Sequence, residues 1–194
     1  MHAARRRIGI VLSGALGAMA LMASPAAAAG IDKPWEVGGY IVSSTYDNDS
    51  TIQDTFAWGV RGSWRIKGPH LLELTYEIQS ADNATKGSDI TFDINKWTLN
   101  YLHDFKVKKP DAKLIPLMLF GFGTMAYDNG TDSDTTTVIQ GGLGVRYLIK
   151  PWFALRFDGK IFHYHGDGPI IPRHGFFGFD LDVGVSFLFG TPKK

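Results

Sequence analysis

Cysteine is absent from this chain of 194 residues, and so is a strong excess of charge of either sign. The missing cysteine excludes a disulfide framework and thiol chemistry. Lys and Arg number 20 and Asp and Glu number 19, so the chain lacks the excess of positive charge that binding to nucleic acid requires. Beyond the N-terminal segment, no run of about twenty apolar residues occurs, which excludes a membrane-spanning helix there.

The N-terminus has the composition of an export signal. Arg5, Arg6 and Arg7 precede an apolar stretch, 8–23, and the small residues of 24–30 follow. A basic region, an apolar region and a small-residue cleavage site predict a signal peptide over 1–29, and the alternative is a membrane anchor. Without these three arginines the formal net charge falls from +1 to about −2. The remaining 30–194 has the length of one domain.

The last apolar segment, 177–189, shows strict alternation. Its odd-numbered positions are all Phe, Leu or Val, whereas the even-numbered ones are Gly, Asp, Ser and one Leu. A period of two is the period of a β-strand. One face of this strand is therefore large, aromatic and uncharged, and it must pack against a protein core or against lipid.

The same period predicts eight strands and no long helix. We place them at 35–44, 55–66, 70–80, 90–104, 114–127, 137–149, 153–162 and 176–189. The phase of the fourth slips near Lys96, which suggests a bulge. The fifth is apolar on both faces, so its phase stays ambiguous.

The residue types on the two faces indicate which face lies inside. The apolar faces carry many Trp, Phe and Tyr, and the opposite faces are rich in Gly, Ala and Ser. Small residues suit the crowded interior of a narrow barrel, and large aromatics suit its lipid-facing exterior. The prediction is an all-β fold, an eight-stranded antiparallel up-and-down transmembrane β-barrel. The alternative is a soluble periplasmic or secreted ligand-binding barrel, whose apolar face would point inward.

The charges of the polar faces are nearly balanced, as an enclosed network should be. We expect Arg61 and Arg65 to pair with Glu73 and Glu77 on the next strand. The carboxylates of the last two strands are expected to pair with the cations of the last three. The predicted lumen network comprises Arg61, Arg65, Glu73, Glu77, Arg146, Arg156, Asp158, Lys160, Asp180 and Asp182.

Connections of alternating length support the membrane interpretation. Short links are expected at 67–69, 106–113 and 150–151, and long polar links at 45–54, 81–89, 128–136 and 163–175. Outer-membrane barrels have short periplasmic turns and long external loops. With eight strands both termini face the periplasm, and Trp64, Phe105, Tyr147 and Trp152 would lie at the periplasmic interface.

Two stretches resemble the small outer-membrane β-barrel family of OmpA-type transmembrane domains and OmpX. Residues 141–147 and 153–158 look like its glycine-rich penultimate hairpin. Residues 182–189 resemble its C-terminal assembly signal, carried here by Asp182, Gly184, Phe187 and Phe189. The family pattern commonly ends on the aromatic residue, whereas five residues follow Phe189 here. The resemblance covers nearly the whole mature chain and implies the Gram-negative outer membrane, with outer-membrane lipid, lipopolysaccharide and the barrel assembly machinery as partners.

Enzymatic and metal chemistry find little support. His163, His165 and His174 lie near Asp167, but their spacing matches no tight metal-binding pattern. A lipid hydrolase needs Ser, His and an acid within hydrogen-bond reach, and Ser186, the first Ser or Thr after these histidines, is assigned to the lumen. We therefore expect no catalytic residue, no metal and no cofactor.

The predicted function is a monomeric outer-membrane barrel with a structural or surface-interaction role and a lumen plugged by ion pairs. The first alternative is a narrow channel or transporter for small solutes. The second is an outer-membrane hydrolase that modifies lipid A. Fold alone does not choose between them, because such barrels serve many roles on one scaffold.

Overall fold

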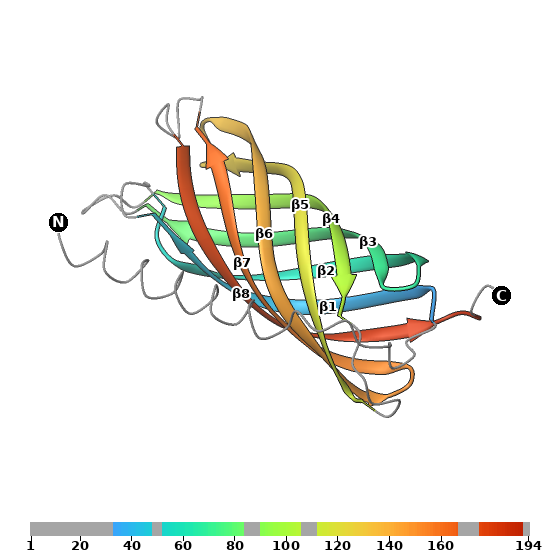
Figure 1. Ribbon diagram of the computed structural model, residues 1–194. Helices are drawn as coiled ribbons and strands as arrows, with labels where there is room; N and C mark the ends of the chain where they lie inside the picture. The colour runs from blue at the N-terminus through green and yellow to red at the C-terminus, as the bar shows by residue number, and fades with distance from the viewer. Residues whose placement is uncertain (1–32, 48–51, 84–89, 106–111, 167–174, 192–194) are drawn as a thin grey trace, which may run out of the picture.

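Eight antiparallel strands form a closed barrel in which each strand pairs with the next and the last pairs with the first (Figure 1). The computed structural model describes residues 33–47, 52–83, 90–105, 112–166 and 175–191, so the predicted signal peptide over 1–29 lies outside the described residues. The strands are β1 (Trp35–Tyr46), β2 (Thr55–Lys67), β3 (His70–Asp82), β4 (Thr91–Asp104), β5 (Leu114–Asp128), β6 (Ser133–Lys150), β7 (Phe153–His165) and β8 (Gly175–Phe189).

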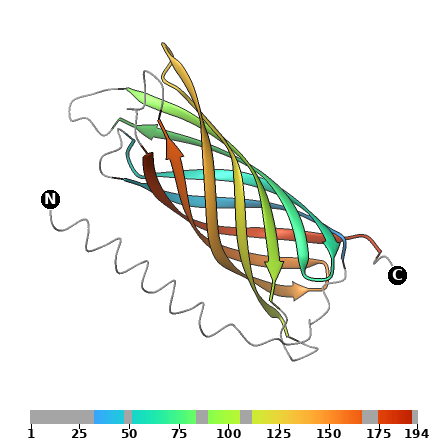
Figure 2. The ribbon, with the colours of Figure 1, turned by 45° about the horizontal axis from the view of Figure 1, so that its top comes forward.

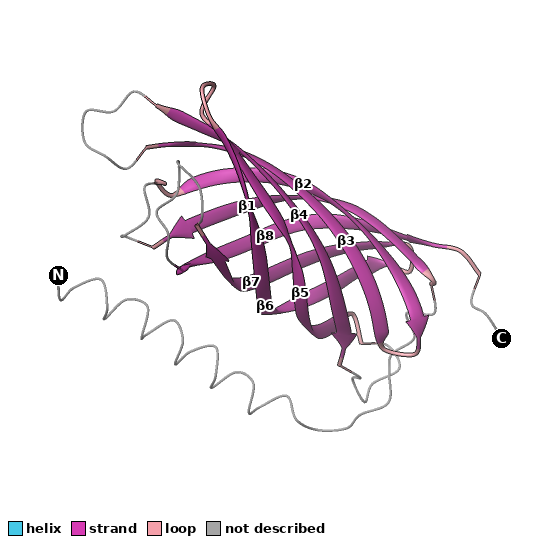
Figure 3. Cartoon of the chain, turned by 90° about the horizontal axis from the view of Figure 1, so that it is seen from above, coloured by secondary structure: helices cyan, strands magenta, loops and turns pink. Residues whose placement is uncertain are grey.

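The predicted fold class is confirmed. Pairing of β1 with β8 runs from Trp35 opposite Phe189 to Tyr46 opposite Gly178, and it closes the sheet without a free edge. The strands run obliquely around a common interior, as Figures 2 and 3 show from two further directions. Closure pairs backbone groups between strands, which a wall exposed to lipid requires. The described part of the chain contains no helix long and apolar enough to cross a membrane.

Side chains alternate between the two sides of the wall along every strand. On β8, Asp180, Asp182 and Ser186 are buried inside, whereas Phe187 and Phe189 are about half exposed on the outside. All five tryptophans of the sequence are on the outer face, each at least 40% exposed. The wall is therefore apolar outside and polar inside, as the residue types predict.

The suggested bulge near Lys96 is wrong. The register of β4 against both neighbours is continuous, with Lys96 opposite Glu77 on β3 and Met125 on β5. What changes along β4 is polarity: Phe92 and Ile94 are buried inside, and Asp93 lies on the outer face. The outer end of this strand thus has a polar exterior and an apolar interior, which imitates a shift of phase in the sequence.

The ambiguous fifth strand also has a regular phase. Ile115, Leu117 and Leu119 point inward, and Phe120 and Phe122 are exposed on the outside. The inward leucines pack with Leu71 and Leu102 of the two preceding strands, and Ile115 packs in a second small apolar cluster near the strand ends that adjoin the short turns. Both faces are apolar because this stretch of the interior is apolar too.

One connection differs clearly from its predicted length. The loop expected over 128–136 is mostly strand, because β5 ends at Asp128 and β6 begins at Ser133. Asn129 Oδ1 accepts hydrogen bonds from the amides of Thr131 and Asp132, at 2.9 and 2.7 Å, and Gly130 has a φ of 80°. The β5–β6 hairpin therefore reaches far at one end (Figure 2). The link expected over 106–113 spans 105–113, one residue more than predicted.

Aromatic rings gather at the end of the barrel that carries the short turns. Trp35 and Trp64 stack on the outer face with ring centroids 6.1 Å apart, and Trp152 stacks on Phe187 at 6.2 Å. Rings with one apolar and one polar edge favour the boundary between lipid and water. At the opposite end of the band Tyr76 stacks on Trp97 at 4.2 Å, so the apolar band is bounded by aromatics on both sides.

A glycine that approaches the neighbouring strand offers a test of this packing. A Cβ added at Gly123 would overlap the Trp97 carbonyl oxygen and lie 2.7 Å from Thr98 Cα, whereas one at Gly62 would meet nothing within 4 Å. Gly123→Ala should therefore destabilise the barrel by about 1–3 kcal/mol, the usual effect of overpacking. Urea unfolding in detergent micelles measures the difference, and Gly62→Ala is the matched control. Equal stabilities of the two variants would contradict the predicted close approach.

Candidate functional site

The interior of the barrel holds a large set of charged side chains, and they form three groups of ion pairs. Six cations contact seven carboxylates, most of them at most 4% exposed. The members are Glu36, Arg61, Arg65, Glu73, Glu77, Lys96, Asp104, Arg146, Arg156, Asp158, Lys160, Asp180 and Asp182. Every strand except β5 contributes at least one of them. We call this set the lumen network.

Two parts of the lumen network are neutral. In one, Arg146 bridges Glu36 and Asp104 at 2.8 Å each, and Arg65 contacts the other oxygen of Asp104 at 2.8 Å. In the other, Arg156 contacts Glu73 and Asp158, and Arg61 contacts Asp158 at 2.7 Å. Each part has two cations and two carboxylates, so each buried charge has a partner of opposite sign, as low-dielectric surroundings require.

The third part carries one carboxylate more than it has cations. Lys96 contacts Glu77 at 2.5 Å and Asp180 at 2.6 Å, and Lys160 contacts Glu77 at 3.0 Å and Asp182 at 2.9 Å. Tyr40 donates a hydrogen bond to Glu77, and Ser44 donates one to Asp180. These hydroxyls supply further donors to the carboxylates, which reduces the cost of their burial.

Several pairs connect strands on opposite sides of the barrel. In a ring of eight, strands four positions apart are diametrically opposed. Arg156 on β7 reaches Glu73 on β3 at 2.5 Å, and Lys160 on β7 reaches Glu77 on the same β3 at 3.0 Å. Lys96 on β4 likewise reaches Asp180 on β8 at 2.6 Å. The network therefore crosses the interior and does not merely line it.

Neutral polar side chains fill the space between these pairs. The Gln140 amide donates to Asn100 Oδ1 at 2.7 Å and to Thr98 Oγ1 at 3.0 Å. The hydroxyls of Thr75 and Thr98 lie 2.5 Å apart. These residues are all less than 5% exposed. Eight strands leave an interior that side chains can just fill.

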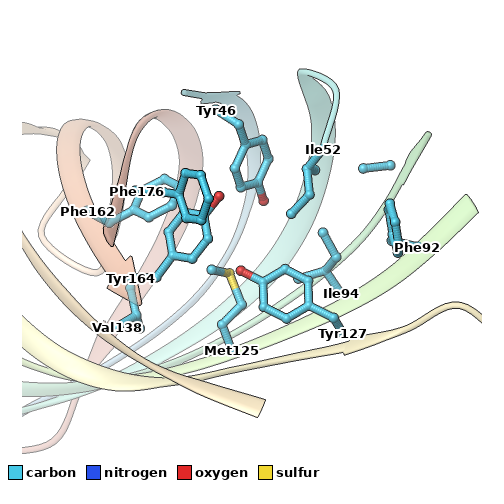
Figure 4. Packing of buried hydrophobic residues seen from close by; sticks show 11 residues of the cluster. Tyr46, Ile52, Phe92, Ile94, Met125, Tyr127, Val138, Phe162, Tyr164 and Phe176 are labelled. Carbon is cyan, nitrogen blue, oxygen red and sulfur yellow. The ribbon is translucent and has the colours of Figure 1, made fainter. Parts of the chain in front are cut away.

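An apolar cluster covers the lumen network at the end opposite the short turns (Figure 4). Tyr46, Phe162, Tyr164 and Phe176 lie together, and ring centroids of Tyr164 and Phe176 are 5.3 Å apart. The cluster consists of Tyr46, Ile52, Ala81, Phe92, Ile94, Met125, Tyr127, Val138, Phe162, Tyr164 and Phe176, each at most 5% exposed. We call it the aromatic cap. It continues into the charged layer, because Lys96 Nζ lies 4.8 Å from the Phe162 ring centroid.

All ten charged residues assigned to the lumen from the sequence lie on the inner face, but several expected pairings are wrong. Arg61 pairs with Asp158 and Arg65 with Asp104, and neither forms an ion pair with Glu73 or Glu77. Asp180 and Asp182 pair with lysines and not with Arg146 or Arg156. The physical reason is convergence: inward side chains point toward the barrel axis, so long ones reach strands beyond their immediate neighbours.

Three members of the network were not predicted. Glu36 lies in the first strand, for which no inner face was assigned, and Asp104 is the last residue of β4. Lys96 lies at the point where the phase of the fourth strand was expected to slip, so it was assigned to neither face. Counting in steps of two from Thr98 and Asn100 would have placed Lys96 and Asp104 on the inner face.

The candidate catalytic groups do not come together. Ser186 is buried inside the barrel, whereas His163 lies on the outer face of β7, where its ring is 4.8 Å from that of Phe177. His174 and Asp167 lie outside the described residues. In the described part, no group of three or more His, Cys, Asp or Glu side chains is arranged around a common metal position.

The four residues of the predicted assembly signal are divided between the two faces of β8. Phe187 and Phe189 project from the outer face, and Asp182 and Gly184 face inward. Phe187 packs with Trp152 and Phe153 at the end of the short turns. The aromatic pair is therefore on the surface that a membrane-embedded partner could contact.

A closed eight-stranded wall with an apolar, aromatic-bounded exterior and a charged interior defines a transmembrane β-barrel of the outer-membrane type. The profile of the outer membrane protein beta-barrel domain family matches residues 13–189, and the chain belongs to this family. It is a protein of the Gram-negative outer membrane. A search of curated protein sequences found no match.

Solved structures share the fold at low sequence identity. Neisserial surface protein A superposes with a TM-score of 0.61 and 13% identity, over 80% of this chain and 97% of that one. The outer membrane protein OprG from Pseudomonas aeruginosa gives a TM-score of 0.53 and 10% identity, over 84% of this chain and 100% of that one. These similarities establish the architecture of the chain. Its role has to be inferred from its own side chains.

Proposed function

We propose that this protein is a closed, monomeric outer-membrane barrel that acts as a structural and surface-contact element and does not conduct solutes. The observation that carries the proposal is the set of ion pairs between opposed strands, β3 with β7 and β4 with β8. A solute on the axis would have to separate these buried pairs, and breaking one is expected to require about 3–5 kcal/mol. The aromatic cap adds a second, apolar barrier at one end.

The polar outer ends of the central strands support the surface role. Beyond the Tyr76–Trp97 pair, the outward residues of β3 to β6 are mostly polar or acidic, and they include Ser80, Asp82, Asp93, Asn95, Thr124, Asp128, Thr135 and Thr137. A wall that changes from apolar to polar leaves the lipid at that level. The projecting β5–β6 hairpin then stands in water outside the cell, where a contact surface belongs.

Lipid and the assembly machinery are the partners this proposal implies. The outer band of Trp, Phe, Leu and Val would contact acyl chains, and the band's polar margin would contact lipopolysaccharide headgroups. The assembly machinery would recognise Phe187 and Phe189 during insertion of the barrel. The continuous pairing of β8 with β1 supports the monomer, because no strand edge is left for a second copy.

Conductance in planar bilayers tests closure. Inserted wild-type protein should give no stable current steps, with an open porin run as the positive control in the same membrane. Insertion is verified by the shift in gel mobility on heating. Stable steps whose size changes when Arg156 or Asp180 is replaced would establish the narrow channel instead.

Lipid A from cells with and without the protein should have the same acylation, and a difference would establish the hydrolase.

A further inference from the structure

Two histidines face each other on the outer surface at the end of the short turns. His70 on β3 is directly opposite His103 on β4, and both side chains are half-buried. The next pair toward the turn, Pro69 and Asp104, is joined by a hydrogen bond from the Asp104 amide to the Pro69 carbonyl. Bonded and non-bonded pairs alternate in antiparallel sheets, so His70 and His103 form a non-hydrogen-bonded pair, the type with the closest side chains.

The donor atoms of this pair have the separation of two ligands of one metal ion. The two Nδ1 atoms are 3.4 Å apart, and the ring centroids are 4.9 Å apart. Tetrahedral Zn²⁺ with nitrogen ligands at about 2.0–2.1 Å places its ligand atoms about 3.3 Å from each other. An ion could therefore enter between the two imidazoles with almost no movement of the strands.

A third donor adjoins the pair. The Tyr101 hydroxyl lies 2.5 Å from His70 Nδ1, and its ring stacks on that imidazole at 5.8 Å. Tyr101 is two residues from His103 on the same face of β4. Its oxygen would need to move away from His70 Nδ1 by about 0.8 Å, within reach of a side-chain adjustment, to match the ligand separation expected around Zn²⁺. The Phe105 ring lies edge-on to His103 at 5.3 Å and restricts that imidazole from the other side.

We propose that His70 and His103 bind a divalent first-row transition metal of the Zn²⁺ and Cu²⁺ class through their Nδ1 atoms, with the Tyr101 oxygen as a third ligand. Two imidazoles and a phenol suit these ions and not Mg²⁺ or Ca²⁺, which prefer carboxylate and carbonyl oxygens. The site lies on the outer face beside the turn at 68–69, at the level of the periplasmic aromatics. It is separate from the lumen network and does not depend on closure of the barrel.

The other described histidines supply a matched control. His163 and His165 also lie on the outer face, but they follow each other on one strand, β7, at the opposite end of the barrel. Residues two apart on a strand are separated by about 6.6 Å. This pair has the same number of imidazoles without the opposed geometry.

Electron paramagnetic resonance of Cu²⁺ added to the folded barrel, purified without an affinity tag, tests the site. Wild-type protein should bind one Cu²⁺ with hyperfine structure from two imidazole nitrogens. His70→Ala and His103→Ala should each weaken binding at least about tenfold, because each leaves a single imidazole ligand. Tyr101→Phe should retain both nitrogens, and the variant with both His163→Ala and His165→Ala should bind like wild type. Zn²⁺ should displace Cu²⁺ competitively, although it binds more weakly to the same ligands.

The wild-type spectrum decides the proposal even if a variant fails to fold. A spectrum with one coordinated nitrogen, or no stoichiometric Cu²⁺ at all, would overturn it. Equal binding by wild type and folded His103→Ala would overturn it as well, and so would loss of binding in the His163 and His165 control. Folding of every variant is checked by heat-dependent gel mobility.

Discussion

Arg156→Ala should lower the free energy of unfolding by about 3–5 kcal/mol, the usual effect of removing one partner from a buried ion pair. Arg156 is 1% exposed, and its guanidinium contacts both Glu73 and Asp158. Its loss leaves Asp158 with Arg61 alone and leaves Glu73 without an ion-pair partner in the described part of the chain. The buried Glu73 carboxylate would then lack a cation, which destabilises the folded state.

Urea unfolding in lipid vesicles, followed by tryptophan fluorescence, measures this loss. Lys150→Ala is the control, because Lys150 is an exposed cation at the end of β6, and it should change stability by no more than about 0.5 kcal/mol. The Arg156→Ala, Glu73→Gln double variant should recover part of the loss, because it removes the unpaired carboxylate together with its partner. Additive losses in the double variant would show that Arg156 and Glu73 are not coupled across the lumen.

Val183→Arg should destabilise the membrane-inserted barrel by about 2–4 kcal/mol, the cost of a cation on the lipid face near the bilayer midplane. Val183 is 40% exposed near the middle of the outer band on β8, between Ile41 and Phe157 on the neighbouring strands. An arginine there would project into acyl chains, where it cannot be hydrated. In a soluble barrel Val183 would instead face the core. The arginine would then prevent folding in water whether or not lipid is present.

The matched control places the same side chain outside the lipid. Thr124 lies on the outer face of β5 opposite Thr137, beyond the apolar band. Thr124→Arg should therefore change stability by only about 0–1 kcal/mol. Reversible unfolding in vesicles of one lipid gives both values. A cost for Thr124→Arg equal to that for Val183→Arg would mean that the polar outer ends of the strands are not above the membrane.

The alternation of residues predicts most of this architecture because a strand in a membrane barrel meets two unlike environments. Eight strands were placed within a few residues of their observed bounds, and the choice of lipid for the aromatic face of β8 is confirmed by the family. The alternation of residues gave a wrong prediction where the polarity of the interior and of the exterior changes along a strand. In β4 the interior turns from polar to apolar at Ile94 and the exterior turns from apolar to polar at Asn95, which the sequence pattern presents as a slip.

The partners within the lumen could not be predicted for a different reason. Sequence patterns locate side chains on a face and a strand, and they favour pairings between neighbours. Arg61 instead reaches Asp158, 97 positions away, across the interior. Such contacts depend on the diameter of the closed barrel and on the reach of each side chain, which no periodicity encodes. The opposed histidines, His70 and His103, were missed because only the register of β3 against β4 brings them together.

The five tryptophans test the central claim, that the apolar face of the wall meets lipid. Trp35, Trp58, Trp64, Trp97 and Trp152 are all exposed on the outer face, and they are spread over three strands and one short turn. The measurement is tryptophan fluorescence of the folded protein in vesicles of phosphatidylcholine with brominated acyl chains. If the apolar face meets lipid, the emission should be strongly quenched, with little further loss on addition of aqueous iodide. Emission that brominated lipid leaves unchanged, from protein that stays in solution without detergent, would contradict it.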